Sequence, residues 1–281
     1  MLECITIIIG YFLFSHVINF IKMHGTLNDF VIIDCREKMY HNINFKKIAH
    51  RKTGIGCDQV IVITSSKKAD CFIHIYNPDG SKVEMCGNAA RCVAYLLSNE
   101  KKNDNITIEL SDRILSCVRT SHDKIQVNMG YPKFHWKDIP VLHECDTLYL
   151  PIKTELLSYP VGVNIGNPHA VFFVDSIDDI PLTKIGPELE NHTLFPNKAN
   201  ISIAQVISRN EIKLRVWERG TGETASCGSA ACATLVAAVR RNYTNHHATI
   251  YLQGGNLLIL YKDDNTILME GVVSYVFSGV I

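Results

Sequence analysis

Most of the chain after Ile21 alternates between short apolar runs and turn-forming residues. The runs are rich in Val, Ile and Phe and are bounded by Gly, Pro, Asp or Asn, a pattern typical of β-strands joined by turns. We expect strands at residues 29–35, 59–64, 69–77, 105–110 and 124–130. The pattern therefore predicts a fold made mainly of sheet.

Only two segments have the pattern of a long helix. Residues 87–97 (GNAARCVAYLL) and 228–241 (GSAACATLVAAVRR) are rich in alanine, and the second is apolar on nearly every side until its two arginines. A helix that is apolar all round is buried rather than laid on a surface. The sequence therefore predicts two buried helices.

The starts of these helices belong to an internal repeat. CGNAARCVA at residue 86 matches CGSAACATL at residue 227, an offset of 227 minus 86, or 141 residues. A second pair of similar segments contains Asn28 and Asn167, which are 167 minus 28, or 139, residues apart. This period is half the chain and far longer than that of a solenoid.

We infer a duplicated α/β (α+β) fold. Two pseudo-symmetric domains each wrap a curved mixed β-sheet or barrel around one central buried helix. We expect the first domain at residues 21–132, completed by a final strand at 271–281, and the second at 133–270. Residues 1–20 are apolar but follow an acidic start, so we expect an extension or a misassigned start rather than a membrane anchor.

Charge and cysteine content narrow the class of protein. The chain has 281 residues, with 28 basic and 28 acidic side chains, and no run of Lys or Arg is longer than two. This balance gives no electrostatic footprint for nucleic acid, so we expect no nucleic-acid partner. The ten cysteines lack the dense spacing of a small secreted domain, which indicates thiols in a reducing cytoplasm.

Two cysteines have the context of reactive groups. Cys86 and Cys227 each directly precede a predicted buried helix, where unpaired backbone N–H groups and the helix dipole favour thiolate over thiol. The glycines that follow let a ligand approach the backbone. With the next polar residue, Asn88 or Ser229, each helix start is a candidate cradle for a carboxylate.

A pair of equivalent thiols suits the inversion of a carbon centre. Inversion needs a base on one face and an acid on the other, and pseudo-twofold symmetry supplies both. One thiolate removes an α-proton while the other thiol delivers a proton, and the roles exchange in the reverse direction. This chemistry needs no cofactor, and we expect none.

Five motifs together resemble the diaminopimelate epimerase family: KMHGTLNDF at 22, GCDQ at 56, YNPDGSKVEMCGNAARC at 76, GNPH at 166 and RVWERGTGETASCGSAAC at 215. The resemblance implies a cofactor-independent isomerase that converts LL-2,6-diaminopimelate to the meso form, for lysine and peptidoglycan precursors. It also implies the two-domain fold and a homodimer in the cytoplasm.

The resemblance also assigns roles to individual residues. Cys86 and Cys227 match the acid/base pair, and Gly87, Asn88, Gly228 and Ser229 match the residues that hold the reacting carboxylate. Further substrate contacts match Asn28, Gln59, Asn77, Asn167, Asn200 and Arg219, while His169 and Glu218 match polar residues near the thiols. A guanidinium and several amide or carboxylate oxygens fit a double zwitterion.

The chain departs from the family pattern at three places. GTLND replaces GLGND at residue 25, and Ala89 and Ala230 replace the second glycine of the two C-G-x-G motifs. Because alanine is the better helix former, we expect a slightly altered approach to the carboxylate and no loss of chemistry.

Two alternatives stay open from the sequence. Proline racemases and hydroxyproline epimerases use a similar cysteine pair, but they carry His where this chain has Asn88, and their substrates leave Arg219 unexplained. The chain could also be a non-catalytic amino-acid-binding protein. We expect no metal site, because Cys227 and Cys232 lie about 140° apart around a helix.

Overall fold

The computed structural model describes residues 17–38, 40 and 42–281. Most of the predicted apolar extension, residues 1–16, lies outside the described residues. The first half contains β1 (Asn19–Gly25), β2 (Asn28–Asp34), α2 (Phe45–Ala49), β3 (Gln59–Thr64), β4 (Cys71–Tyr76), β5 (Lys82–Val83), α3 (Gly87–Lys101), β6 (Asn105–Glu109), β7 (Ile114–Arg119) and β8 (Lys124–Gly130).

The second half repeats the same order of elements. It contains β9 (Val161–Asn164), β10 (Pro168–Phe173), α4 (Leu182–Glu190), β11 (Asn200–Ser208), β12 (Glu211–Glu218), β13 (Gly222–Thr224), α5 (Gly228–Arg240), β14 (His247–Leu252), β15 (Gly255–Tyr261) and β16 (Ile267–Val272), followed by β17 (Ser274–Val280). Each element from β1 to β8 has a counterpart from β9 to β16. The predicted duplication is confirmed.

Strand pairing is also the same in the two halves. In the first half β1–β2 and β3–β4 are antiparallel, whereas β2–β3 and β4–β6 are parallel. In the second half β9–β10 and β11–β12 are antiparallel, whereas β10–β11 and β12–β14 are parallel. The sheets are therefore mixed, as the sequence predicts.

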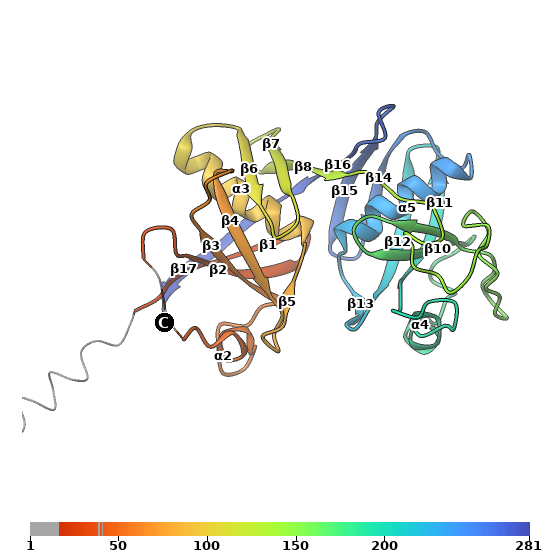
Figure 1. Cartoon of the computed structure of the whole chain (residues 1–281), viewed down its shortest axis with the longest axis horizontal. Helices are drawn as coiled ribbons and strands as arrows, with labels where there is room; N and C mark the ends of the chain where they lie inside the picture. The colour runs from red at the N-terminus through yellow and green to blue at the C-terminus, as the bar shows by residue number, and fades with distance from the viewer. Residues whose placement is uncertain (1–16, 39, 41) are drawn as a thin grey trace, which may run out of the picture.

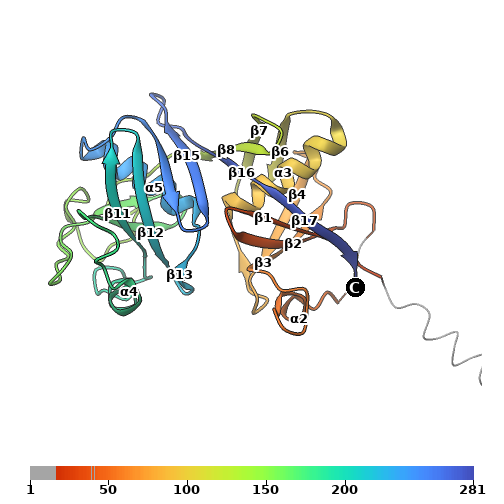
Figure 2. The same ribbon diagram turned by 180° about the vertical axis from the view of Figure 1, so that it is seen from behind.

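Two strands join the halves. β8 pairs antiparallel with β16, and the two cross between the lobes in both views (Figures 1 and 2). After β16 the chain enters the first lobe, where β17 pairs with β1. The exact domain boundaries proposed from the sequence stay a prediction.

The two long helices are buried inside their sheets, as predicted. α3 packs against β1, β6, β7 and β8, and α5 packs against β9, β10 and β15. The apolar side chains of α5 are buried through the segment from Ala230 to Ala238, because sheet surrounds the helix on most sides. α3 runs to Lys101, four residues past the predicted end, and stops at Lys102 in a left-handed conformation (φ 50°).

The sequence pattern did not reveal the two shorter helices. α2 has five residues, and α4 contains Pro187 in its interior, which weakens any helical signal. α4 packs against β11, β12 and β13, over a separate apolar cluster that includes Phe172, Leu182 and Ile203. In the part of the chain that the structure describes, no helix is long and apolar enough to span a membrane.

Candidate active site

The two long helices begin at the cysteines singled out from the sequence. Cys86 and Cys227 are the N-cap residues of α3 and α5, and both have extended backbone conformations, with φ of −143° and −134°. An extended N-cap residue directs its side chain toward the free N–H groups of the first helical turn. The fold therefore gives the two cysteines equivalent positions.

Glycine follows each cysteine because the two helix starts approach each other closely. A Cβ atom on Gly87 would lie 2.6 Å from Met269 Cε, and one on Gly228 would lie 2.8 Å from Met269 Sδ and 3.3 Å from Asn88 Oδ1. Met129 also reaches Gly87 and is the repeat counterpart of Met269, 269 minus 129, or 140, residues away. The first turns of α3 and α5 thus meet around these methionines.

The first thiol is surrounded by amide groups. Cys86 Sγ lies 3.6 Å from Asn28 Oδ1, which also accepts a hydrogen bond of 3.2 Å from Asn88 Nδ2. Asn28 in turn donates to Asp58 Oδ2 at 3.0 Å, which fixes the orientation of its amide. Burial raises the pKa of the Cys86 thiol to about 11, and the N–H groups of Asn88 and Ala89 oppose that shift.

The second thiol lies beside a carboxyl group. Cys227 is 6% exposed, and its Sγ is 3.5 Å from Ser229 Oγ. Burial and the neighbouring Glu218 raise the pKa of Cys227 well above its ordinary value. Burial likewise raises the pKa of Glu218, whose Oε1 accepts a hydrogen bond of 2.5 Å from Thr224.

The helix starts alone do not make these thiols acidic. The sequence analysis predicted that N–H groups and the dipole favour thiolate, and these N–H groups do lower both pKa values. Burial, however, raises them by more, so both thiols are protonated at neutral pH in this structure. A positively charged group next to a thiol would lower its pKa. An ammonium group on the ligand could therefore activate the thiol that it approaches.

Two further candidates form a pair at the edge of the first sheet. Gln59 Nε2 donates to Asn77 Oδ1 at 3.2 Å, and neither side chain bonds to another predicted site residue in the described part of the chain. Gln59 Oε1 is buried and has no hydrogen-bond partner among the described residues. That oxygen is a free acceptor for a donor such as an ammonium group.

The corresponding edge of the second sheet carries the remaining candidates. His169 Nε2 lies 2.9 Å from Asn167 Oδ1, and burial lowers the pKa of His169 to about 3, so the ring is neutral. Asn200 donates to Pro168 O and accepts from the backbone N–H of Arg219, both at 2.9 Å. The exposed Arg219 side chain donates to Asn197 O at 3.2 Å.

Several residues that contact the site were not predicted. Asp58 orients Asn28, and Thr26, Arg91 and Ser226 form a buried polar cluster between the helix starts. The adjacent Gln59 could have directed attention to Asp58, and the 140-residue offset could have found Met129 and Met269. No periodic pattern marks Arg91, since an arginine in a helix usually points to solvent.

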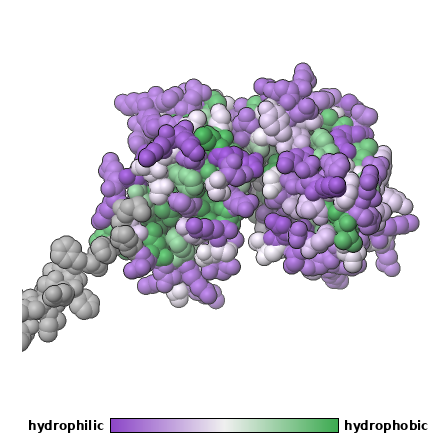
Figure 3. All heavy atoms as spheres, in the orientation of Figure 1, coloured by the Kyte–Doolittle hydropathy of each residue, from purple (hydrophilic) through white to green (hydrophobic). Residues whose placement is uncertain are grey.

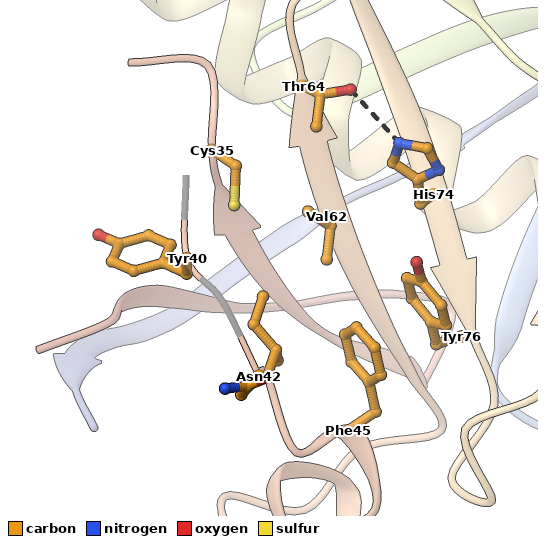
Figure 4. Close-up of a pocket in the computed structure, with 9 residues that line it drawn as sticks. Cys35, Tyr40, Asn42, Phe45, Val62, Thr64, His74 and Tyr76 are labelled. Atoms are coloured by element: carbon orange, nitrogen blue, oxygen red, sulfur yellow. Dashed lines mark hydrogen bonds between the residues drawn. The ribbon is translucent and has the colours of Figure 1, made fainter. Parts of the chain in front are cut away.

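A separate cavity of about 360 Å³ lies on the outer face of the first sheet, which Figure 3 shows as a gathering of apolar residues over β2 and β3. Val62, Thr64, His74 and Tyr76 line it, whereas their neighbours Ile61 and Ile73 face α3 (Figure 4). Tyr76 stacks on Phe45 with ring centroids 3.8 Å apart. No predicted site residue lines this cavity.

Comparison with known proteins identifies the family. A sequence model of diaminopimelate epimerase matches the chain twice, at residues 20–135 and 161–276. The chain belongs to the diaminopimelate epimerase family. The two matched segments correspond to the two structural repeats, and they include both helix starts.

Relatives of this family align over nearly the whole chain. The chain is 60% identical to a diaminopimelate epimerase of Wolbachia sp. subsp. Drosophila simulans, over 92% of this chain and 97% of that protein. It is 43% identical to a diaminopimelate epimerase of Rhodospirillum centenum, over 92% and 91% of the two chains. Such coverage extends the similarity to both halves.

Solved structures of low sequence identity share the fold. A phenazine biosynthesis protein of the PhzF family from Bacillus anthracis superposes with a TM-score of 0.70 at 16% identity, over 95% of this chain and 99% of that chain. A hydroxyproline epimerase from Agrobacterium vitis gives 0.68 at 11% identity, over 95% and 93%. The mixed α/β fold of two repeated domains is therefore confirmed.

Proposed function

We propose that this protein is a cofactor-independent isomerase that epimerises LL-2,6-diaminopimelate to meso-diaminopimelate, a precursor of lysine and peptidoglycan. The observation that carries the proposal is the pair of cysteines at two helix starts that face each other across the repeat. Relatives named diaminopimelate epimerase at up to 60% identity support the choice of substrate.

The reaction proceeds through two proton transfers on opposite faces of the α-carbon. On one face a cysteine thiolate forms an S–H bond as the α-C–H bond breaks, and the electron pair moves into the substrate carboxylate. On the other face the second cysteine gives its thiol proton to the carbon and becomes the thiolate. Cys86 and Cys227 exchange roles in the reverse direction.

The reacting carboxylate binds between the two helix starts. The free N–H groups at Gly87 and Asn88, and at Gly228 and Ser229, stabilise the negative charge that develops on it. The close approach of the two first turns supports this position, because both glycines lack room for a side chain.

The distal half of the substrate binds residues at the two sheet edges. Arg219 pairs with the far carboxylate, since its exposed guanidinium bonds to only one carbonyl among the described residues. Gln59 and the asparagines Asn28, Asn77 and Asn167 hold the ammonium groups. Asn200 uses both ends of its amide within the protein, so its role is to hold the backbone of Arg219.

Two auxiliary residues act next to the thiols. Glu218 lies beside Cys227 and can accept its proton when the carboxyl group is ionised. His169 is neutral and orients the amide of Asn167. Neither residue is placed to replace a cysteine as the group that transfers the α-proton.

The protein acts as a homodimer in the cytoplasm. β17 pairs only with β1 in the described part of the chain, and its apolar residues Tyr275, Val276, Phe277 and Val280 are exposed. An exposed apolar edge strand is a template for pairing with another chain. A second copy of the protein supplies an equivalent strand.

A substrate panel tests the function. The purified protein, in reducing buffer without added cofactor, is incubated with LL-diaminopimelate, L-proline or trans-4-hydroxy-L-proline, and the stereoisomers are separated. We expect meso-diaminopimelate and no change in the other two. Turnover of the proline substrates alone would assign the racemase alternative, and binding of diaminopimelate without turnover would assign a binding protein.

Cysteine variants test the residues. Cys86→Ser and Cys227→Ser should each lower kcat at least a hundredfold, because a hydroxyl is a much weaker acid than a thiol. Cys145→Ser is the matched control, since this half-buried cysteine lies in the apolar cluster under α4. Equal activity of all three variants would contradict the two-thiol mechanism.

A further inference from the structure

A hydrogen bond between two buried hydroxyl groups joins the halves of the molecule. Thr26 Oγ1 and Ser226 Oγ are 2.6 Å apart, although 200 residues separate them in the sequence. Thr26 lies in the turn between β1 and β2, two residues before Asn28. Ser226 directly precedes Cys227. The bond therefore connects the loop that contacts Cys86 with the residue next to the other thiol.

The turn that carries Thr26 is strained. Thr26 and Leu27 have φ of 52° and 64°, a left-handed conformation that is unfavourable for a β-branched residue. The family motif GLGND has glycine where this chain has Leu27. Backbone strain of this kind persists only where surrounding contacts hold it. The contacts of Thr26 must therefore favour this conformation.

The turn is held against the second half by close packing. A Cβ atom on Gly254, between β14 and β15, would clash with the carbonyl oxygen of Thr26. Gly255 also faces Thr26, at 3.2 Å from the position of its Cβ to Thr26 Cγ2. Only glycine at residue 254 allows this approach, so the contact between the halves at Thr26 is specific.

A buried arginine supports the same hydroxyl. Arg91 is 0% exposed, and its Nη2 donates to Thr26 Oγ1 at 3.3 Å and to Asn88 Oδ1 at 2.7 Å. Its Nη1 donates to Val272 O in β16 at 3.1 Å. Within residues 17–38, 40 and 42–281, no carboxylate forms an ion pair with it. Since burying a charge without an ion pair is unfavourable, its hydrogen bonds are the reason for its position.

We propose that the Thr26–Ser226 hydrogen bond, oriented by Arg91, is a positioning device that fixes the spacing of the two thiols. Asn88 Nδ2 also lies 3.5 Å from Ser226 Oγ, so the cluster reaches the first turn of α3. The inference rests on the proposed two-thiol epimerisation, which needs both sulfur atoms aligned on one carbon. A displacement of about 1 Å at such a centre can lower a rate a hundredfold.

Substitutions that remove only the hydroxyl groups test this role. We expect Thr26→Val and Ser226→Ala each to lower kcat about tenfold and to change KM less than threefold. The double variant should be no slower than the slower single variant, because both changes remove the same bond. Thr26→Ser, which keeps the hydroxyl, should recover most of the activity lost in Thr26→Val.

The reaction in D2O gives a readout that a merely structural role would not change. With misaligned thiols, the α-carbon regains hydrogen from the face that lost it, so unreacted substrate acquires deuterium without inversion. We expect the ratio of deuterium in recovered LL-diaminopimelate to deuterium in meso product to rise at least threefold in Thr26→Val and Ser226→Ala.

The matched control is Thr234→Val. Thr234 is a fully buried threonine in α5 whose hydroxyl has no partner among the described residues. This variant should keep the parent kcat and deuterium ratio. Circular dichroism checks that every variant is folded.

An unchanged kcat and deuterium ratio in folded Thr26→Val and Ser226→Ala would overturn the inference. An equal loss in Thr234→Val would overturn it too, since any buried threonine would then behave alike. Failure of the parent protein to epimerise diaminopimelate would instead contradict the proposed function, and the two failures are therefore distinguishable.

Discussion

At the scale of single residues, burial decides the state of the active thiols. The N–H groups of the helix starts lower the pKa of Cys86 and Cys227, but removal of the thiolates from water raises both by more. A cysteine is therefore acidic here only when a cation replaces the lost solvation. The ammonium group of an amino-acid substrate provides such a cation.

This balance predicts the pH dependence of the reaction. The kcat/KM reports ionisations of the free enzyme, and the pKa of Cys86 is raised to about 11. Because the reactive form is the thiolate, kcat/KM should rise with pH from 7 to 9. Initial rates at low substrate concentration measure it, and a profile that is flat or falls over this range would contradict the high thiol pKa.

The repeat made the central residues predictable and left others hidden. Cys86, Cys227 and Asn28 have counterparts at a common offset, so sequence alone marks them. Arg91 has no such mark, because its burial depends on contacts with Thr26 and Val272 from distant strands. The resting pKa of the thiols was also hidden, since burial depends on tertiary packing.

At the scale of elements, the site depends on how closely the first turns of α3 and α5 approach. Gly87 and Gly228 have no room for a side chain, whereas Ala89 and Ala230 are fully buried without such a conflict. The departure from the family glycines thus lies where a methyl group fits. The two positions in each motif should respond differently to substitution.

Glycine and alanine exchanges test this difference. Gly228→Ala should lower kcat at least tenfold and destabilise the fold by about 1–3 kcal/mol, because the new methyl meets Met269. Ala89→Gly should destabilise by up to about 1 kcal/mol and leave kcat near the parent value. Steady-state kinetics and urea unfolding measure both, and a larger kcat loss in Ala89→Gly would contradict the packing argument.

Strands and long helices were predictable because their patterns are local. The predicted strand at residues 59–64 coincides with β3, and that at 124–130 coincides with β8. The pairing of β8 with β16 joins residues far apart in sequence, and nothing local specifies it. α4 was missed because Pro187 interrupts its pattern.

At the scale of the whole molecule, the account predicts that β17 forms an interface. Val276→Lys places a charge on its exposed apolar surface and should shift the protein from dimer to monomer, as measured by analytical ultracentrifugation. Ile207→Lys is the matched control, because Ile207 and Val276 are both 48% exposed. Loss of the dimer in both variants, or in neither, would contradict an interface at β17.

The two-lobed arrangement matters most because it places one thiol on each side of a substrate carbon. The most direct test is the position of deuterium early in the reaction of LL-diaminopimelate in D2O. Two bases predict deuterium in newly formed meso-diaminopimelate and almost none in the unreacted LL isomer. Equal early deuterium in both isomers would show a single base that serves both faces, and would contradict the two-thiol account.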